Sequence, residues 1–202
     1  MNIFKKIFGN KKEDKPSDKP LESRGKFMPE INFPIDEKFT INFRKNGGKF
    51  LYCENTEELN ENFQNILTEN DWESHYACCL SDTLQRRFSG FNINFDKTCR
   101  DATFFITTCE NLVADNGSIL INSNQIGEKK LFELPDNFIV YATTSQLVDT
   151  IGEGLRGIKS KNKSQIPTNI TTIKHFSLKE EKDFLSYGSS SKNLYLLLLE
   201  DL

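Results

Sequence analysis

The sequence predicts an α/β protein, a three-layer sandwich around a mixed, mostly parallel β-sheet with some antiparallel hairpin content. From Phe27 onward, strand-like and helix-like segments alternate, which is typical of this fold class. At least two of the strand-like segments are unbroken apolar runs, as expected of strands that are covered on both faces. The 202 residues, of which 37% are hydrophobic and 11% aromatic, can bury one substantial core, so we expect one domain.

The first 26 residues are predicted to form a disordered basic tail ahead of a domain that covers residues 27–202. The tail holds eight of the 26 basic residues against four acids, which leaves 18 bases and 25 acids, a net charge of −7, on the remainder. It has almost no large apolar residue after Phe8 and cannot contribute much to a core. The alternative is that MNIFKKIF lies on an anionic membrane or a partner as a short amphipathic helix, although two helical turns are marginal alone.

Two strand-helix steps open the predicted domain. KFLYCEN at 49–55 indicates a strand, and Thr56 is expected to cap the helix after it, in which apolar residues recur at helical spacing. The residues that share one face of this helix are Leu59, Phe63, Ile66 and Leu67. HYACCL at 75–80 indicates a second strand, and Ser81 can cap a short helix, DTLQRRF.

Three further strands and one helix follow. ATFFITTC at 102–109 and FIVYATT at 138–144 are rich in β-branched and aromatic residues, as strands are. Ser145 is then expected to cap a helix, QLVDTIGEGLRGI, and the lysine-rich stretch 159–169 is expected to be a loop. The closing NLYLLLLEDL contains six successive apolar residues, which predicts a strand covered on both faces.

The stretch LVADNGSILI at 112–121 predicts a β-hairpin. Asn116-Gly117 is the strongest local signal for a tight turn in which both central residues need positive φ. Asp115, Asn116 and Ser118 would also bring a carboxylate, an amide and a hydroxyl to one exposed bend. We therefore expect the turn to present functional groups as well as to connect two strands.

Ligands of open α/β sheets collect at the carboxyl ends of the strands. This places candidate residues at Cys53-Glu54-Asn55, at Thr107-Thr108 and at Thr143-Thr144. Glu54 and Glu110 are the acids nearest to these ends, where a carboxylate could act as a base or nucleophile. The simpler interpretation is that both are solvated surface carboxylates.

Composition and cysteine spacing exclude several classes. A net charge of −3 gives no basic face for nucleic acid. The five cysteines lack CxxC spacing, so we expect buried thiols and no disulfide framework, zinc site or iron–sulfur site. No apolar run approaches the roughly 18 residues of a transmembrane helix, and the N-terminus does not resemble a signal peptide. We therefore expect a cytoplasmic protein without metal or cofactor.

Other patterns have plain interpretations. GEGLRG at 152–157 matches GxGxxG but sits inside a helical pattern, and YGSSSKN at 187–193 lacks Walker spacing and is more simply a turn. His75 and His175 have no acidic partner at a meaningful spacing and are expected to be structural or surface residues. Cys78-Cys79 would point to opposite faces of a strand and so could not hold one metal.

Two blocks of the sequence resemble the LUD domain of the lactate-utilisation protein C (LutC/YkgG) family. The first is ITTCENLVADNGSILI at 106–121 and the second is KLFELPDNFIVYATTSQLVDTIGEGL at 130–155. The residues at family positions are Ala114, Asp115, Gly117, Ser118, Leu131, Leu134 and Pro135, with Asn116 where threonine is usual. The family's G-P-S-x-T-x-D-I-E segment is absent, and TTIKHFSLKEEKDFLS at 171–186 takes its place.

The resemblance implies a NagB/RpiA/CoA-transferase-like fold and a link to L-lactate oxidation. It implies a non-redox accessory protein whose partners are iron–sulfur companion subunits, a small organic acid, or further copies of itself in a homo-oligomer. The alternative is a small-molecule enzyme of the phosphosugar isomerase or CoA-transferase group. We assign no catalytic residue; the ligand-binding candidates are Asp115, Asn116, Gly117, Ser118, Thr107, Thr108, Glu110, Glu54 and Thr144.

Overall fold

A computed structural model of the chain describes residues 33–176 and 191–201. Residues from Pro34 onward form one compact unit. The predicted tail at 1–26, its alternative helix and the boundary at residue 26 lie outside the described residues. So do most of the segment 171–186 and the first half of YGSSSKN.

The core of the compact unit is a six-stranded sheet in which every neighbouring pair of strands is parallel. In spatial order the strands are β1 (Lys49–Cys53), β10 (Asn193–Leu199), β7 (Asn137–Thr143), β4 (Phe104–Thr108), β2 (Tyr76–Cys78) and β3 (Asn94–Asp96). The central strands β10, β7 and β4 are almost entirely buried, which explains their unbroken apolar sequences. The α/β, mostly parallel architecture predicted from the sequence is confirmed.

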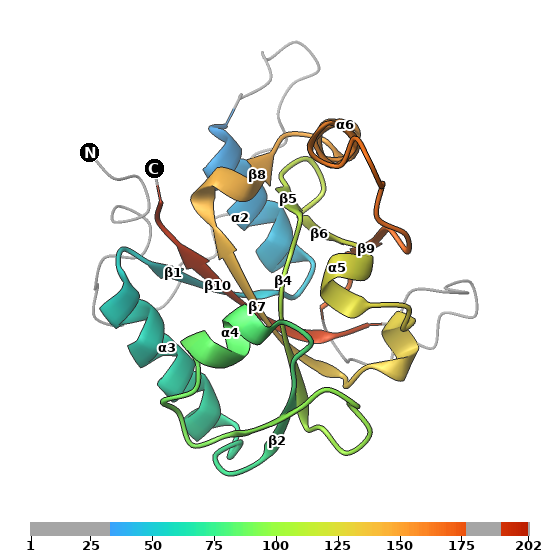
Figure 1. Cartoon of the computed structure of the whole chain (residues 1–202). Helices are drawn as coiled ribbons and strands as arrows, with labels where there is room; N and C mark the ends of the chain where they lie inside the picture. The colour runs from blue at the N-terminus through green and yellow to red at the C-terminus, as the bar shows by residue number, and fades with distance from the viewer. Residues whose placement is uncertain (1–32, 177–190, 202) are drawn as a thin grey trace, which may run out of the picture. The chain divides into compact units, whose positions relative to one another are not determined.

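One face of this sheet is covered by α3 (Thr56–Glu69) and α4 (Asp82–Arg87), which lie side by side in Figure 1. Their apolar residues join Leu51 of β1 in one core cluster, in which Trp72 stacks on Phe104 with ring centroids 4.8 Å apart. The neighbouring Phe50 points to the opposite face and contacts Phe43 of α2 (Ile35–Lys45). Helices therefore cover both faces.

The antiparallel content lies in a second, four-stranded sheet. Its strands in spatial order are β8 (Leu147–Val148), β5 (Asn111–Val113), β6 (Ser118–Ile121) and β9 (Thr171–Ile173). The remaining elements are α5 (Ser123–Ile126), α6 (Ile151–Lys161) and two 3-10 turns, η1 (Leu131–Glu133) and η2 (Thr144–Gln146). The mixed sheet predicted from the sequence is thus two sheets, one parallel and one mixed.

Two helix starts differ from the sequence prediction. Asn55, not Thr56, caps α3, because its side-chain oxygen accepts a hydrogen bond from the Glu58 N–H at 2.9 Å. The helix expected after Ser145 begins only at Ile151, where Thr150 is the cap. The residues in between form η2 and β8, because β8 pairs with β5 and this tertiary contact overrides the local helical pattern. By contrast, Ser81 caps α4 as predicted.

The prediction that all five cysteines are buried thiols is wrong for two of them. Cys78 and Cys99 form a disulfide, 21 residues apart in the sequence. Spacing alone does not show this pairing, because it depends on the loop after β3 returning along β2, where the Thr103 N–H donates to the Tyr76 carbonyl. Cys79 is buried on the opposite face from Cys78, in the cluster under α4, as the strand pattern predicted.

The two histidines, His75 and His175, are exposed. GEGLRG lies within α6, as its helical context predicted. None of the described helices combines the length and the apolar character needed to span a bilayer.

Candidate functional site

The hairpin at LVADNGSILI is present, but its loop is longer than predicted. β5 and β6 pair in antiparallel register with Val113 opposite Ser118, which leaves four residues, 114–117, as the hairpin loop. Gly117 has a φ of +64°, whereas Asn116 is not among the described residues with positive φ. The prediction of a two-residue primed turn is therefore wrong. Instead, the Asn116 side-chain oxygen accepts from the Ser118 N–H at 3.0 Å.

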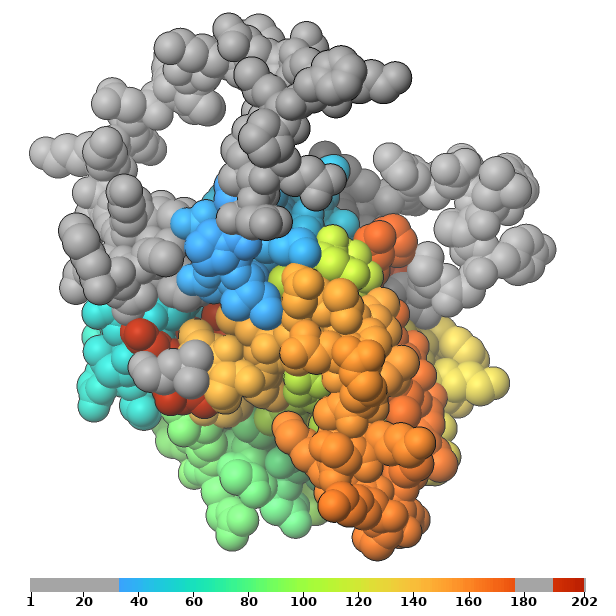
Figure 2. Space-filling view, turned by 90° about the horizontal axis from the view of Figure 1, so that it is seen from above, coloured from blue at the N-terminus to red at the C-terminus, as the bar shows by residue number. Residues whose placement is uncertain are grey.

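The backbone of the hairpin loop is held by two amides from α2. Asn42 Nδ2 donates to the carbonyls of Ala114 and Asp115 at 2.8 and 3.2 Å. Asn46 Nδ2 donates to the carbonyls of Asn116 and Gly117 at 2.7 and 3.3 Å. All four loop carbonyls are therefore paired, and Figure 2 shows the yellow-green loop enclosed between α2 in blue and the orange segment that contains β8.

Gly117 is required at its position for two reasons. Its φ lies in the left-handed region, and a Cβ there would lie 2.3 Å from the backbone carbon of Asn42 and the backbone nitrogen of Phe43. The glycine of the motif thus allows the backbones of the loop and α2 to approach each other. This is a structural reason for the Asn-Gly pair, independent of any ligand.

Asp115 and Ser118 do not share one exposed surface. Asp115 is exposed, and its backbone N–H donates to the Asp149 carbonyl at 3.0 Å. Ser118 is only 1% exposed, and its hydroxyl has no hydrogen-bond partner among the described residues. The sequence placed both groups on one exposed bend, but the alternation of β6 turns Ser118 inward.

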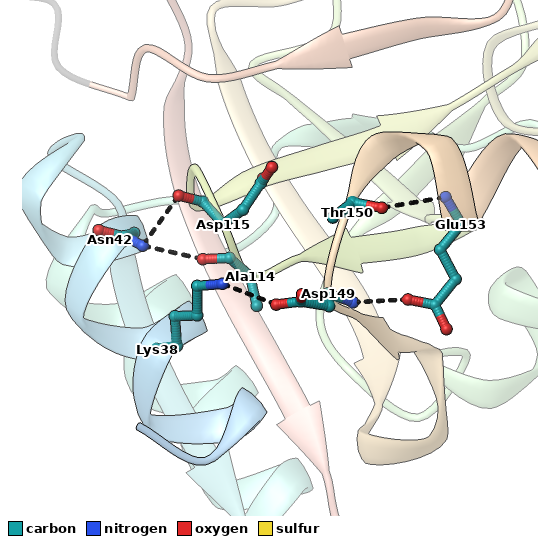
Figure 3. Close-up of polar contacts among 7 residues, drawn as sticks. All are labelled: Lys38, Asn42, Ala114, Asp115, Asp149, Thr150 and Glu153. Carbon is teal, nitrogen blue, oxygen red and sulfur yellow. Dashed lines mark hydrogen bonds and ion pairs between the residues drawn. The ribbon is translucent and has the colours of Figure 1, made fainter. Parts of the chain in front are cut away.

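The charges beside the loop are paired with one another (Figure 3). Lys38 Nζ lies 2.7 Å from Asp149 Oδ1, and this hydrogen bond raises the pKa of Lys38. The Asp149 N–H donates to Glu153 at 3.0 Å, and the Glu153 N–H donates to Thr150 at 3.2 Å. These contacts hold α2, the hairpin loop and the start of α6 together. In Figure 3 the Asp115 side chain points away from Lys38 and Asp149.

A second region is the carboxyl edge, which we define as the ends of the adjacent strands β1, β10, β7 and β4. The register places Cys53 beside Leu199, and Leu199 beside Thr143. Four of the nine predicted candidates are at these ends: Glu54 after β1, Thr144 after β7, Thr108 at the end of β4, and Glu110 just beyond it. The topology therefore collects them along one line, as the strand-end argument predicted.

Most polar groups at this edge already bind one another. Thr144 Oγ1 and the backbone N–H of Ser145 each donate to Asp201 Oδ1 at 2.9 Å. Although desolvation alone would raise it, these bonds and those from the Ser145 and Thr143 hydroxyls lower the pKa of Asp201 to about 2. The sequence did not indicate Asp201, because only the parallel pairing of β7 and β10 brings it to Thr144.

The two predicted acids are both engaged. Glu110 Oε1 accepts from Gln125 Nε2 at 2.9 Å and from Asn124 Nδ2 at 3.5 Å. Glu54 also interacts within the protein, and its backbone N–H donates to Glu58 Oε2 at 2.8 Å. Thr107 is 3% exposed and donates to the Thr108 carbonyl at 3.1 Å. Glu110, Glu54 and Thr107, which lie close to the strand ends, thus interact with neighbouring residues of the protein.

Arg87, at the end of α4, is the functional candidate that the sequence analysis did not identify. Its Nε and Nη2 atoms are buried and have no hydrogen-bond partner among the described residues. Its Cζ lies 4.9 Å from the ring centroid of Tyr141 on β7. A signal was available, because Arg87 lies between Leu84 and Phe88 on the face of α4 that packs inward.

The cysteines do not form a metal-binding set. Burial raises the pKa of the Cys53, Cys79 and Cys109 thiols, so these side chains are protonated, and the other two cysteines are bonded to each other. Over residues 33–176 and 191–201, no three His, Cys, Asp or Glu side chains come together as a metal site would require.

These features define an α/β protein with a parallel central sheet and a line of polar residues at the carboxyl ends of its strands. A model of the LUD domain matches residues 92–199, more than half of the chain, so this protein belongs to the LUD domain family. That family is associated with lactate utilisation. The match confirms the family predicted from the sequence, whereas membership of the lactate-utilisation protein C subfamily stays a prediction.

The fold is similar to that of a solved DUF162 family protein from Deinococcus radiodurans. The TM-score is 0.57 at 14% sequence identity, and the match covers 83% of this chain and 96% of that chain. At this identity the likeness shows the fold alone. No curated protein matches the sequence.

Proposed function

We propose that this protein is a non-redox component of L-lactate utilisation that binds a small organic acid at the carboxyl edge. Iron–sulfur companion subunits, as partners, would carry the electrons. The family association supports the pathway, and the chemistry of the cysteines supports the non-redox role. Four thiolates are the usual ligands of an iron–sulfur cluster, and the five cysteines here are either protonated and buried or bonded to each other.

The observation that carries the binding proposal is the direction in which the chain leaves the strands. After β1 it crosses to α3 on one face of the sheet, and after β7 it crosses to β8 on the other face, with β10 between them. At such a switch the two connections diverge, and α/β proteins commonly bind small ligands above the strand ends at this point.

The experiment is a thermal-shift screen with L-lactate, pyruvate, sugar phosphates and CoA esters. Binding to the folded state raises the melting temperature, so the proposal expects a shift with lactate or pyruvate. A strong shift with a CoA ester or sugar phosphate alone would instead support the alternative, a small-molecule enzyme. Co-purification with candidate iron–sulfur subunits, with and without lactate, tests the accessory role.

A further inference from the structure

Arg87 has the largest unmet hydrogen-bonding demand in the described part of the chain. Four buried side-chain atoms there have no partner: Arg87 Nε, Arg87 Nη2, Ser118 Oγ and Asn122 Nδ2. The serine and asparagine groups are neutral, whereas the guanidinium is permanently charged. Since a buried charge without a partner costs much more than a buried neutral group, Arg87 is the group that most needs a ligand.

The two unpaired atoms are the pair that suits a carboxylate. Nε–H and one Nη2–H point in parallel from the same edge of a guanidinium, and two parallel donors match the two oxygens of a carboxylate. An arginine that only packed its alkyl stem would leave its nitrogens in water. Arg87 is half-buried as a residue, but this donor edge lies within the protein.

The guanidinium is held in position before any ligand arrives. The Tyr141 ring lies 4.9 Å from Cζ and fixes the plane of the guanidinium by cation–π attraction. On either side of Arg87 in the sequence, Leu84 and Phe88 anchor α4, and Phe88 stacks on Phe63 of α3 at 4.2 Å between ring centroids. A ligand would therefore not need to order this side chain, which favours binding.

The position of Arg87 is at the carboxyl edge. Tyr141 lies two residues before the end of β7 and pairs in register with Thr108, the last residue of β4. Thr108 and Thr143 share the face of Tyr141, because alternate residues of a strand and register partners point the same way. Thr108 therefore lies beside Tyr141, and Thr143 lies two residues further toward the strand end, on the face that Arg87 covers.

We propose that Arg87 binds the carboxylate of a small monocarboxylic acid through Nε and Nη2, with Tyr141 beneath the guanidinium. A hydroxyl or carbonyl next to that carboxylate would face the threonines at the ends of β4 and β7. This inference rests on the proposed function in one respect, namely that the carboxyl edge is the ligand site. It adds the residue that recognises the carboxylate of the ligand.

The variants that test the proposal are Arg87→Lys and Arg87→Gln, with Arg86→Gln as the matched control. Arg86 is the neighbouring arginine of α4 and is exposed, so its loss changes the net charge equally without touching the edge. For L-lactate, measured by calorimetry, Arg87→Gln should lose affinity by about tenfold or more, and Arg87→Lys nearly as much because it lacks the paired donors. Arg86→Gln should stay within about twofold.

Lactamide is the matched probe, because it keeps the size of lactate and removes the carboxylate. It should not compete with lactate for the parent protein. If Arg87→Gln and Arg87→Lys bind lactate like the parent, or if lactamide competes equally well, the inference is overturned even though lactate binding by the protein would still stand.

A measurement without any variant covers the case in which the substitutions unfold the protein. The NMR signal of Arg87 Nε–H should shift when acetate is added and should not shift with an equal concentration of chloride. A shift with acetate in a protein that ignores lactate would support the carboxylate site and reject lactate as its ligand. No shift with acetate or lactate would overturn the inference, and a shift with inorganic phosphate alone would replace carboxylate by phosphate.

Discussion

Two regions of the molecule differ in how many of their buried polar groups have hydrogen-bond partners. They are the hairpin loop and the part of the carboxyl edge where Arg87 of α4 lies over Tyr141. In the hairpin loop, four backbone carbonyls are paired with Asn42 and Asn46, and the adjoining charges of Lys38 and Asp149 are paired with each other. At the edge, the Nε and Nη2 donors of Arg87 are buried and have no hydrogen-bond partner among the described residues. The more recognisable motif thus has all its loop carbonyls paired, and its one unpaired buried group, the Ser118 hydroxyl, is neutral. Buried donors without hydrogen-bond partners indicate, better than the match to a sequence motif does, where a ligand would bind.

The largest effect is expected from Gly117→Val, which tests whether the hairpin loop is structural. The new side chain would need a positive φ and would occupy space 2.3 Å from the backbone of α2. We expect a loss of roughly 4 kcal/mol or more in the free energy of unfolding, because such large losses are typical of severe steric conflicts. Urea unfolding measures it. The control is Gly90→Ala, because nothing lies within 4 Å of that added Cβ; equal losses in both variants would contradict the account.

An intermediate effect is expected from Asn42→Ala, which removes the amide that pairs two carbonyls of the hairpin loop. Leaving partly buried acceptors without partners should cost about 1–3 kcal/mol. The same urea experiment applies, with Asn124→Ala as a control because that amide makes only a 3.5 Å contact with Glu110. An unchanged free energy of unfolding in Asn42→Ala would show that water takes over the hydrogen bonds of the Asn42 amide.

A small effect on stability is expected from Asp115→Ala and Ser118→Ala, the two motif positions with functional side chains. Asp115 is exposed, and the Ser118 hydroxyl is buried without a partner, so each loss should change the free energy of unfolding by no more than about 0.5 kcal/mol. Lactate affinity should stay within about twofold of the parent. A loss of lactate affinity without a loss of stability in either variant would show that the ligand binds at the hairpin loop and not at Arg87.

The smallest effect concerns Asp201, a fully paired group at the same edge as Arg87. Its pKa is lowered to about 2, so its contribution to stability is complete above the ordinary pKa of about 3.8 and is lost as the pH falls through about 2. NMR titration of the side-chain carboxyl should show this low pKa. Asp201→Asn should be slightly less stable than the parent at pH 7, by an amount that shrinks between pH 4 and pH 2. A normal pKa would mean that the hydroxyl cluster does not form.

The central strands could be predicted from the sequence, because strands that are buried on both faces consist of unbroken apolar or β-branched runs. The run at 194–199 and the β-branched segments at 102–109 and 138–144 became β10, β4 and β7. The family blocks were also readable, and Gly117 shows why: the backbone geometry at that position excludes other residues. Local sequence therefore determined the central strands, where the hairpin lies, and that the protein belongs to the LUD domain family, but it did not indicate the short strands β3, β8 and β9.

Only the tertiary structure decided which polar groups are satisfied. β8 replaced a predicted helix start because it pairs with β5, and Asp201 reached Thr144 because β10 lies beside β7. Cys78 met Cys99 through a returning loop, and Arg87 was placed over Tyr141 by the packing of α4. Each of these contacts joins residues far apart in the chain, so no local pattern encodes them. A side chain's partners, or the lack of them, are fixed only when the sheet and its helices have packed together.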